Sequence, residues 1–160
     1  MRDLRAVVFA YSEVGHACLK ELLNQGTTVQ AVFTHKDNRS ETLWFSSVAA
    51  LAREAGIPVF TPDALGDEEY ALVRSLRPDV LFSFYYRSMI AERFLAIPPK
   101  GAFNMHGSLL PKYRGRACVN WAVLNGETET GATLHHMVRR PDAGDIVDRE
   151  AVPILPDDTA

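Results

Sequence analysis

Short apolar segments without polar alternation recur along the first two-thirds of the chain. The clearest are AVVFAY at residues 6–11 and DVLFSFYY at residues 79–86, with TVQAVFTH at residues 28–35 and IPVF at residues 57–60 between them. A strand that is buried on both faces has this continuous apolar character, whereas a strand with one face in water alternates apolar and polar residues. These segments therefore predict a parallel sheet that is covered by helices on both faces.

Segments with the apolar spacing of an amphipathic helix follow these predicted strands. They are residues 12–24, with Ser12 as N-cap and Gly26 after the last turn, residues 48–55, ended by Gly56, and residues 68–76, followed by Pro78. Serine at a helix start, and glycine or proline just after a helix end, are typical boundary residues. The alternation of strands and helices predicts an α/β fold with a doubly wound, mostly parallel, Rossmann-like sheet.

The first predicted strand is not followed by the glycine pattern of a dinucleotide site. The sequence after it, AYSEVGHACLKELL, contains a single glycine, Gly15, and lacks G-x-G-x-x-G. In a dinucleotide site those glycines allow a tight turn and close approach of the backbone to a pyrophosphate. The sequence therefore gives no local support for hydride chemistry.

The composition indicates one globular domain with neither a nucleic acid nor a membrane as partner. The chain has 160 residues, is 47% hydrophobic and carries a formal net charge of −3, and it contains no stretch near the roughly 20 apolar residues of a membrane span. Cys18 and Cys118 have no metal or redox spacing, so both are predicted to be buried thiols in a reducing compartment. Since the start of the sequence lacks a signal-peptide pattern, a cytoplasmic location is expected.

A further predicted strand places an amide and an imidazole on one face. In GAFNMHG, residues 101–107, Asn104 and His106 are two positions apart, so their side chains project to the same side. Beyond the carboxyl end of a parallel sheet, such an amide can donate to an oxyanion and the imidazole can move a proton to or from an amine. Asp142 and Asp145 are both candidates for orienting the imidazole. The alternative interpretation, polar side chains satisfied by the backbone, remains open from this spacing alone.

Four motifs occur in the second half of the sequence. They are asparagine-x-histidine at residues 104–106, S-L-L-P-x-Y-R-G at residues 108–115, T-G-x-T-x-H at residues 130–135 and D-x-G-x-I at residues 142–146. Together they resemble the core of the folate-dependent formyltransferases, and the resemblance extends over essentially the whole chain. Within that family, VVFAYSEVG, AVFTHKDN, FSFYYRSMI and NWAVLNGETETG most resemble the formyltransferase domain of the bifunctional polymyxin-resistance proteins.

The resemblance implies a Rossmann-like formyltransferase fold and a reaction that uses 10-formyltetrahydrofolate as co-substrate, without a metal. Matched position by position, the catalytic residues of the family fall on Asn104, His106 and Asp142. The resemblance also implies a folate pocket formed by Ser88, Met89, Ile90, Arg116, Val138, Arg139, Arg140, Pro141 and Asp142. The acceptor it implies is the amine of a sugar nucleotide, UDP-4-amino-4-deoxy-L-arabinose, in lipid A modification and polymyxin resistance.

Other acceptors and another class of function remain open at this point. Methionyl-tRNA formyltransferase is the first alternative in the family, although the acidic net charge argues against a tRNA acceptor. A hydrolase that hands the formyl group to water would use the same three residues. A non-catalytic folate or sugar-nucleotide binding module is the alternative of another class, but a pure binder has no need of Asn104, His106 and Asp142 together.

Two features depart from the family pattern. Cys118 stands where the family usually has proline after GRA, which alters the entry into the helix expected there. Residues 156–159 have the pattern of a helix start, yet only Ala160 follows. We therefore expect residues 1–160 to be an N-terminal formyltransferase catalytic domain that is incomplete at its C-terminal end. A fused or associated dehydrogenase/decarboxylase domain is an expected partner.

Several polar side chains have a structural interpretation beside a functional one. Lys112 and Arg114 either attract an anionic substrate or belong to a solvated loop. His135 and His136 face opposite sides of a predicted strand, so they are not expected to bind one metal ion together. Core packing or plain surface is the first expectation for the others, namely Tyr85, Tyr86, Arg87 and residues 36–38.

Overall fold

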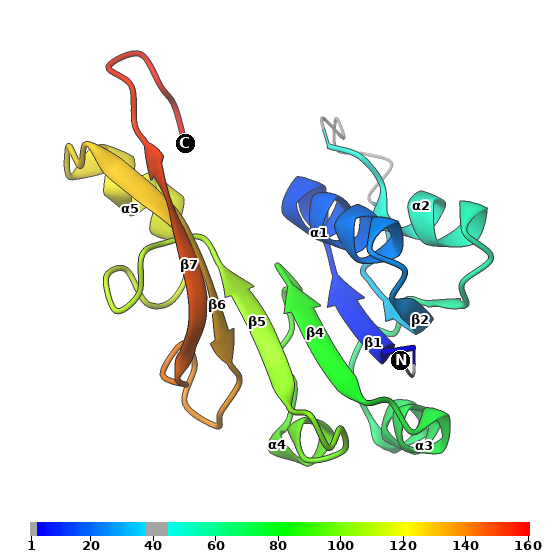
Figure 1. Ribbon diagram of the computed structural model, residues 1–160. Helices are drawn as coiled ribbons and strands as arrows, with labels where there is room; N and C mark the ends of the chain where they lie inside the picture. Colours follow the sequence, from blue (N-terminus) through cyan, green and yellow to red (C-terminus); the bar gives the residue numbers. More distant parts are fainter. Residues whose placement is uncertain (1–2, 38–44) are drawn as a thin grey trace. The chain divides into compact units, whose positions relative to one another are not determined.

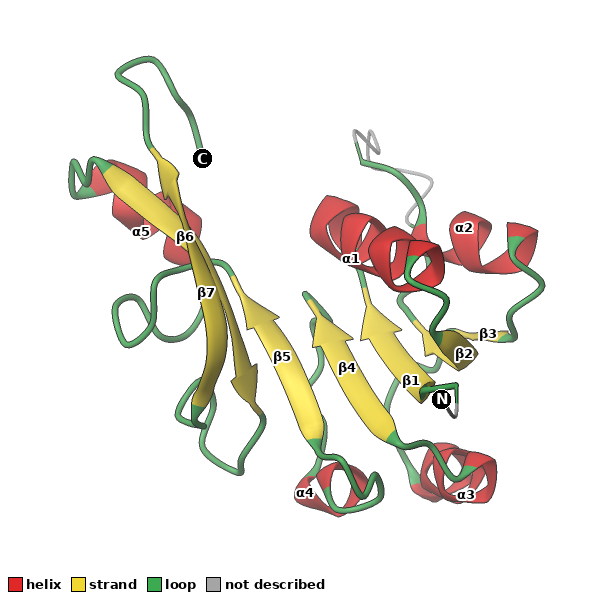
Figure 2. Ribbon diagram, viewed as in Figure 1, coloured by secondary structure: helices red, strands yellow, loops and turns green. Residues whose placement is uncertain are grey.

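The computed structural model describes residues 3–37 and 45–160, so Asn38, which was expected to be plain surface, lies outside the described residues. The chain divides into two compact units, Met1–Ala102 and Phe103–Ala160. The first contains the helices and strands from β1 to α4, and the second contains α5, β6, β7 and most of β5 (Figures 1 and 2).

The first unit is a parallel sheet with the strand order β3-β2-β1-β4. Its elements are β1 (Arg5–Ala10), α1 (Ser12–Asn24), β2 (Thr28–Phe33), α2 (Val48–Glu54), β3 (Val59–Phe60), α3 (Asp67–Leu76), β4 (Val80–Phe84) and α4 (Glu92–Leu95). The chain runs outward from β1 to β3 and then returns to the other side of β1. Because crossovers between parallel strands are right-handed, helices before and after this reversal cover opposite faces of the sheet. The predicted doubly wound, mostly parallel α/β class is confirmed.

Strand β1 supplies the centre of the first unit's core. Its residues from Ala6 to Ala10 are fully buried. Phe9 stacks on Phe33 of β2 with ring centroids 4.7 Å apart, and it meets Phe94 of α4 edge-on at 6.4 Å. Fully burying one such ring stabilises the fold by roughly 1.5–3 kcal/mol. The uninterrupted apolar sequence of this strand therefore reflects helices packed on both of its faces.

The start of α1 differs from the prediction. Ser12 is the first residue of the helix, with φ 62°, and the N-cap is Tyr11, which makes no side-chain cap bond. The Tyr11 N–H donates instead to the carbonyl oxygen of Phe84 at 3.0 Å. A Cβ at Gly15 would lie 3.0 Å from that same oxygen, so this close approach of α1 to the end of β4 requires glycine.

The second unit is an antiparallel arrangement in the order β5-β6-β7 with one helix. Its elements are β5 (Ala102–His106), α5 (Cys118–Leu124), β6 (Glu129–His136) and β7 (Ile146–Pro153). Strand β6 alternates between buried and more exposed residues, which is typical of a half-buried strand. A Cβ at Gly131 would collide with the carbonyl oxygen of Glu150 and with Leu109. Glycine therefore allows β6 to lie against both β7 and the loop after β5.

The residues of the predicted helix start, 156–159, include a turn at residues 156 and 157. The Asp158 carboxylate accepts the Leu155 N–H at 2.7 Å, and the Asp158 N–H donates to the Leu155 carbonyl at 3.0 Å. Aspartate favours such turns for the same reason that it favours helix starts, since its short side chain bonds nearby backbone groups.

Neither cysteine of the chain forms a disulfide. Cys118 is buried as predicted, whereas Cys18 is only half-buried, on α1. Within residues 3–37 and 45–160, no helix is both long and apolar enough to cross a membrane.

Candidate functional site

The three predicted catalytic residues all belong to the second unit. Asn104 and His106 lie on β5, and Asp142 lies in the loop between β6 and β7. The Nδ1 atom of His106 is 3.5 Å from Oδ1 of Asp142. The structure therefore brings the predicted imidazole and the predicted carboxylate together.

The His106 ring is oriented by a backbone carbonyl that the sequence did not indicate. Its Nε2 atom lies 2.7 Å from the carbonyl oxygen of Tyr113, and because a carbonyl only accepts, Nε2 must carry a proton and donate it. The ring is 6% exposed. Tyr113 belongs to the S-L-L-P-x-Y-R-G motif, so one role of that loop is to fix the tautomer of His106. The other nitrogen, Nδ1, faces Asp142.

The surroundings of His106 favour its charged form. Burial alone lowers the pKa of the imidazole, but the Cys118 thiol, the Tyr113 carbonyl and the negative charge of Asp142 outweigh it. The pKa of His106 is therefore raised above the ordinary 6.5. The contact between His106 and Cys118 also changes the pKa of the thiol. Burial raises the pKa of Cys118, but the neighbouring His106 lowers it, and the pKa of the thiol is on balance below its ordinary value.

Asp142 is held by contacts to both of its carboxylate oxygens. Oδ2 accepts the Gly115 N–H at 2.8 Å, and Oδ1 lies 3.5 Å from Nε2 of His135 as well as from His106. Burial raises the pKa of this carboxyl, but the Gly115 N–H and the charge of His106 lower it below its ordinary value. Asp142 therefore stays ionised beside the two rings.

Asp145, the other candidate for orienting His106, has a different place. It is exposed, and its backbone carbonyl accepts the His136 N–H at 2.9 Å. Among the described residues its carboxylate makes no ion pair with either histidine of the site. A Cβ at Gly144 would collide with the carbonyl oxygen of His136. The chain between Asp142 and Asp145 is thus pressed against the end of β6, and glycine makes this possible.

His135, the histidine of the T-G-x-T-x-H motif, also belongs to this cluster, a role that was not predicted from the sequence. It pairs with Asn104 in the β5–β6 register and is 2% exposed. Its Nδ1 lies 2.9 Å from the His136 carbonyl oxygen and therefore carries the proton, which leaves Nε2 to accept from Asn104 Nδ2 at 3.2 Å. The feature that connects His135 to the site is the strand pairing, because the antiparallel pairing of residues 102–106 with 129–136 places His135 opposite Asn104. As predicted, His136 faces the other way and is exposed.

The residues of the predicted folate pocket belong to both units. In the second unit, Arg116 and the segment before Asp142 are all exposed, namely Val138, Arg139, Arg140 and Pro141. In the first unit, Ser88, Met89 and Ile90 follow β4. Met89 is 69% exposed and Ser88 is half-buried, whereas Ile90 is packed into the core.

Tyr86 and Arg87 make internal contacts in the first unit. Tyr86 stacks on His35 with centroids 4.4 Å apart, and the Arg87 guanidinium lies 4.5 Å from the Tyr11 ring centre. The Arg87 N–H also donates to Nε2 of His35 at 3.1 Å. Burial is the main cause that raises the pKa of Tyr86, to about 12. Packing therefore accounts for these two side chains.

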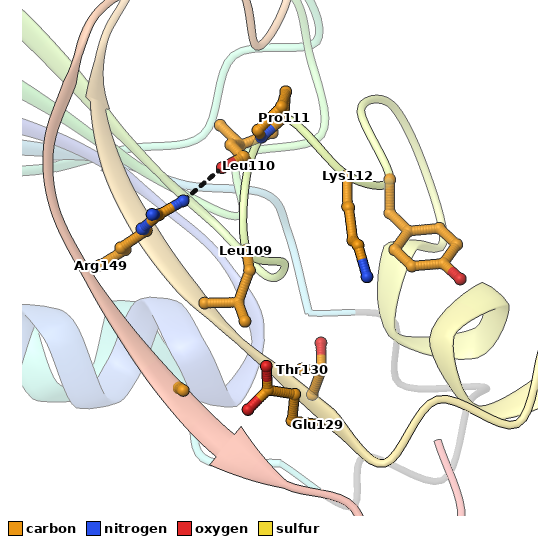
Figure 3. Close-up of a pocket in the computed structure, with 9 residues that line it drawn as sticks. Leu109, Leu110, Pro111, Lys112, Glu129, Thr130 and Arg149 are labelled. Atoms are coloured by element: carbon orange, nitrogen blue, oxygen red, sulfur yellow. Dashed lines mark hydrogen bonds between the residues drawn. The ribbon is translucent and has the colours of Figure 1, made fainter.

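A cavity of about 400 Å³ in the second unit lies beside the loop after β5. Figure 3 shows Lys112 approaching it from that loop and Glu129 from β6, with the Arg149 guanidinium bonded to the Leu110 carbonyl at 3.0 Å. None of Asn104, His106 and Asp142 lines it. Residues 109–113 of the loop that carries the Tyr113 carbonyl form part of its wall. Across the described part of the chain, no three side chains of His, Cys, Asp or Glu are grouped so that they could hold a metal ion.

Comparison with known proteins identifies similar chains. Residues 4–160 match the family model described as formyl transferase. The phosphoribosylglycinamide formyltransferase of Brucella melitensis is 27% identical over 99% of this chain and 84% of that chain, with a TM-score of 0.78. The phosphoribosylglycinamide formyltransferase of Bacillus halodurans is 23% identical over 97% of this chain and 82% of that chain, with a TM-score of 0.78. A formyltetrahydrofolate deformylase from Pseudomonas syringae pv. tomato is 21% identical over 99% of this chain and 54% of that chain, with a TM-score of 0.80.

Proposed function

Because the chain belongs to the formyl transferase family, we propose that it transfers a formyl group from 10-formyltetrahydrofolate to the amine of a sugar nucleotide. The acceptor we propose is UDP-4-amino-4-deoxy-L-arabinose, in the cytoplasmic part of lipid A modification that leads to polymyxin resistance. The observation that carries the proposal is the cluster of Asn104, His135, Asp142 and His106, in which each side chain contacts the next.

The reaction begins when the neutral amine attacks the formyl carbon. A bond forms between the amine nitrogen and that carbon, and the electron pair of the C=O bond moves to oxygen. Asn104 has one amide proton bonded to His135, so the second proton remains for this oxyanion. A positioned donor of this kind is worth about 10²–10³ in rate.

The proton transfers run through His106. Its Nε2 proton is committed to the Tyr113 carbonyl, so Nδ1 is the nitrogen that exchanges protons with the substrates. As the intermediate collapses, the bond between carbon and the folate nitrogen breaks, and that nitrogen takes the Nδ1 proton. The proton lost by the amine returns to His106, which balances the step. Asp142, 3.5 Å from Nδ1, stabilises the charged ring, and general acid–base catalysis typically contributes about 10²–10⁴ in rate.

Exposed cations next to these residues suit two anionic substrates. We assign the exposed Arg116, Arg139 and Arg140 to the carboxylates of folate, and Val138 to an apolar contact with one of its rings. Arg114 and Lys112 remain for the diphosphate of the acceptor, although Lys112 also lies 3.6 Å from Glu127. The sugar-nucleotide acceptor rests on the resemblance of the sequence motifs and on these cations.

The test is a mass-spectrometric assay with 10-formyltetrahydrofolate and three acceptors: UDP-4-amino-4-deoxy-L-arabinose, phosphoribosylglycinamide and water alone. The expected result is a mass gain of one formyl group on the sugar nucleotide only. Formylation of another amine moves the chain to another branch of the family, and formate release without an amine product makes it a hydrolase. Asn104→Ala and His106→Ala are the controls, and each is expected to keep the thermal unfolding transition while losing turnover. Binding of folate without any product would leave a binding module.

A further inference from the structure

Four arginines line a cavity of about 650 Å³ in the first unit. They are Arg5 at the start of β1, Arg74 and Arg77 at the end of α3, and Arg93 on α4. Figure 1 shows α3 beside the end where β4 begins, so the cavity lies at the opposite end of this strand from Ser88. The volume falls within the range of small-molecule sites, about 300–1,000 Å³.

Two of the four guanidiniums already have a carboxylate partner. Arg5 makes a forked pair with Asp79, with Nε and Nη2 each 3.1 Å from a carboxylate oxygen. Arg93 lies 2.6 Å from Asp67 and 4.8 Å from the Tyr70 ring centre. These contacts hold both side chains in place and compensate their charge.

Arg74 and Arg77 have no carboxylate within ion-pair distance among the described residues. Their backbones meet at the end of α3, where the Arg77 N–H donates to the Arg74 carbonyl, and the Leu76 carbonyl accepts from the Gln30 side-chain amide at 2.8 Å rather than from either guanidinium. Two uncompensated positive charges therefore face one cavity in a chain whose net charge is −3. Arginine presents five N–H donors in a planar fork that matches the oxygens of a phosphate.

The rest of the wall is apolar. Pro78, Ile97 and Pro99 line the cavity beside the Tyr70 ring. A site of this composition suits a ligand with an anionic group at one end and a compact organic body at the other. We propose that this cavity binds a small organic phosphate, with the phosphoryl group held by Arg74 and Arg77 and the organic part against the proline and isoleucine wall. The proposal goes beyond formyl transfer and does not depend on it.

The test is isothermal titration calorimetry with ADP and with inorganic diphosphate, at constant ionic strength set with chloride. Saturable binding with a Kd below about 1 mM is expected for ADP. Arg74→Gln/Arg77→Asn should raise the Kd at least about tenfold, since two charge-assisted contacts are lost. Asparagine is chosen because Arg77 has φ 48°, which asparagine tolerates better than most residues. Should the double variant lose its thermal transition, each single variant should still raise the Kd at least about threefold.

Arg53→Gln is the matched control, because Arg53 is an exposed arginine near the end of another helix of the same unit and does not line the cavity. It should leave the Kd unchanged. The proposal is overturned if ADP does not saturate at millimolar concentration or if the double variant binds within twofold of the parent. An equal loss in Arg53→Gln, or loss of binding in Arg139→Gln/Arg140→Gln, would also overturn it, since the anion would then be held elsewhere. A Kd for inorganic diphosphate equal to that for ADP would contradict the proposed contact between the organic part of the ligand and the apolar wall.

Discussion

At the scale of single residues, the charge state of His106 is set by neighbours from three segments. The Tyr113 carbonyl fixes one ring nitrogen, Asp142 faces the other, and the Cys118 thiol adds to the rise of the pKa. A general acid works best when its pKa lies near the working pH. Raising the pKa of His106 therefore increases the fraction of protonated rings at neutral pH, where the folate nitrogen needs a proton.

Cys118→Ala tests this pKa without touching the residues proposed to act on the substrates. Formyl transfer should fall as pH rises through the raised pKa of His106, so this limb of the kcat/KM profile should lie above pH 6.5. Loss of the thiol lowers the pKa and should move the limb to lower pH. Cys18→Ala is the control. Burial is the single cause that raises the pKa of the Cys18 thiol, to about 11, so among the described residues this thiol has no ionisable partner whose pKa it could change. An unmoved limb in Cys118→Ala would show that the thiol does not tune His106.

His135 is proposed as a positioning residue that acts through Asn104. Its Nε2 accepts from the Asn104 amide at 3.2 Å, so His135→Leu should leave that amide without its partner and lower kcat by about 10²-fold with little change in KM. His135→Gln, which restores an acceptor, should recover a large part of the loss. Equal losses in both variants, with unchanged thermal unfolding, would contradict a role through this hydrogen bond.

At the scale of elements, the loop between β6 and β7 carries Asp142 in a demanding conformation. Asp142 has φ 53°, a left-handed value that few residues other than glycine adopt. Its carboxylate is bonded to the Gly115 N–H, and Gly144 lies against the His136 carbonyl. The position of Asp142 therefore depends on backbone contacts of the loop as much as on its own side chain.

Gly144→Ala should displace this loop. The added Cβ would collide with the His136 carbonyl oxygen, so the backbone must shift and carry Asp142 away from His106. We expect kcat to fall by about 10²-fold or more, because misplacement by about 1 Å can cost that much, while the core of the unit stays folded. Gly66→Ala is the control, since its nearest new contact, Glu69 Oε2, is at 3.4 Å. The interpretation fails if Gly144→Ala keeps full turnover.

Elements with a strong local signal were predictable from the sequence, and those that depend on distant contacts were not. The buried strands are recognisable by continuous apolar runs such as residues 6–11. Gly26 and Gly56 are recognisable as helix ends because glycine readily adopts the positive φ that the structure shows at both positions. Ser12 was misassigned because the N-cap position depends on the Tyr11 bond to Phe84, which lies 73 positions further along the chain. Helix α4, only four residues long, has too little periodicity to be recognised.

The same distinction holds for the candidate site. Asn104 and His106 could be paired from their spacing, and Asp142 was one of two candidates until the resemblance was considered. His135 and Tyr113 belong to quoted motifs, but their roles were not predicted, because one depends on the register between β5 and β6 and the other on a backbone carbonyl positioned by a loop. Tertiary placement, not residue type, decides these roles.

At the scale of the whole molecule, the net charge and the local charge have opposite signs. The chain carries −3 overall, yet Arg114, Arg116, Arg139 and Arg140 are exposed near the residues proposed for folate and acceptor. An anionic substrate is repelled by the net negative charge of the chain and attracted by these four arginines. Because exposed charges are screened beyond about 10 Å at 0.1 M salt, local cations should dominate once the substrate is near.

Arg139→Gln/Arg140→Gln should therefore raise the KM for 10-formyltetrahydrofolate about tenfold at low salt with little change in kcat. The difference from the parent should shrink as salt is added, since screening weakens in the parent the attraction that the variant has already lost. The KM for the acceptor should change less. The control is Lys20→Gln/Arg53→Gln, which removes the same two positive charges from exposed helix positions of the first unit. If the control raises the folate KM equally, the total charge governs binding and the segment before Asp142 has no direct part in it.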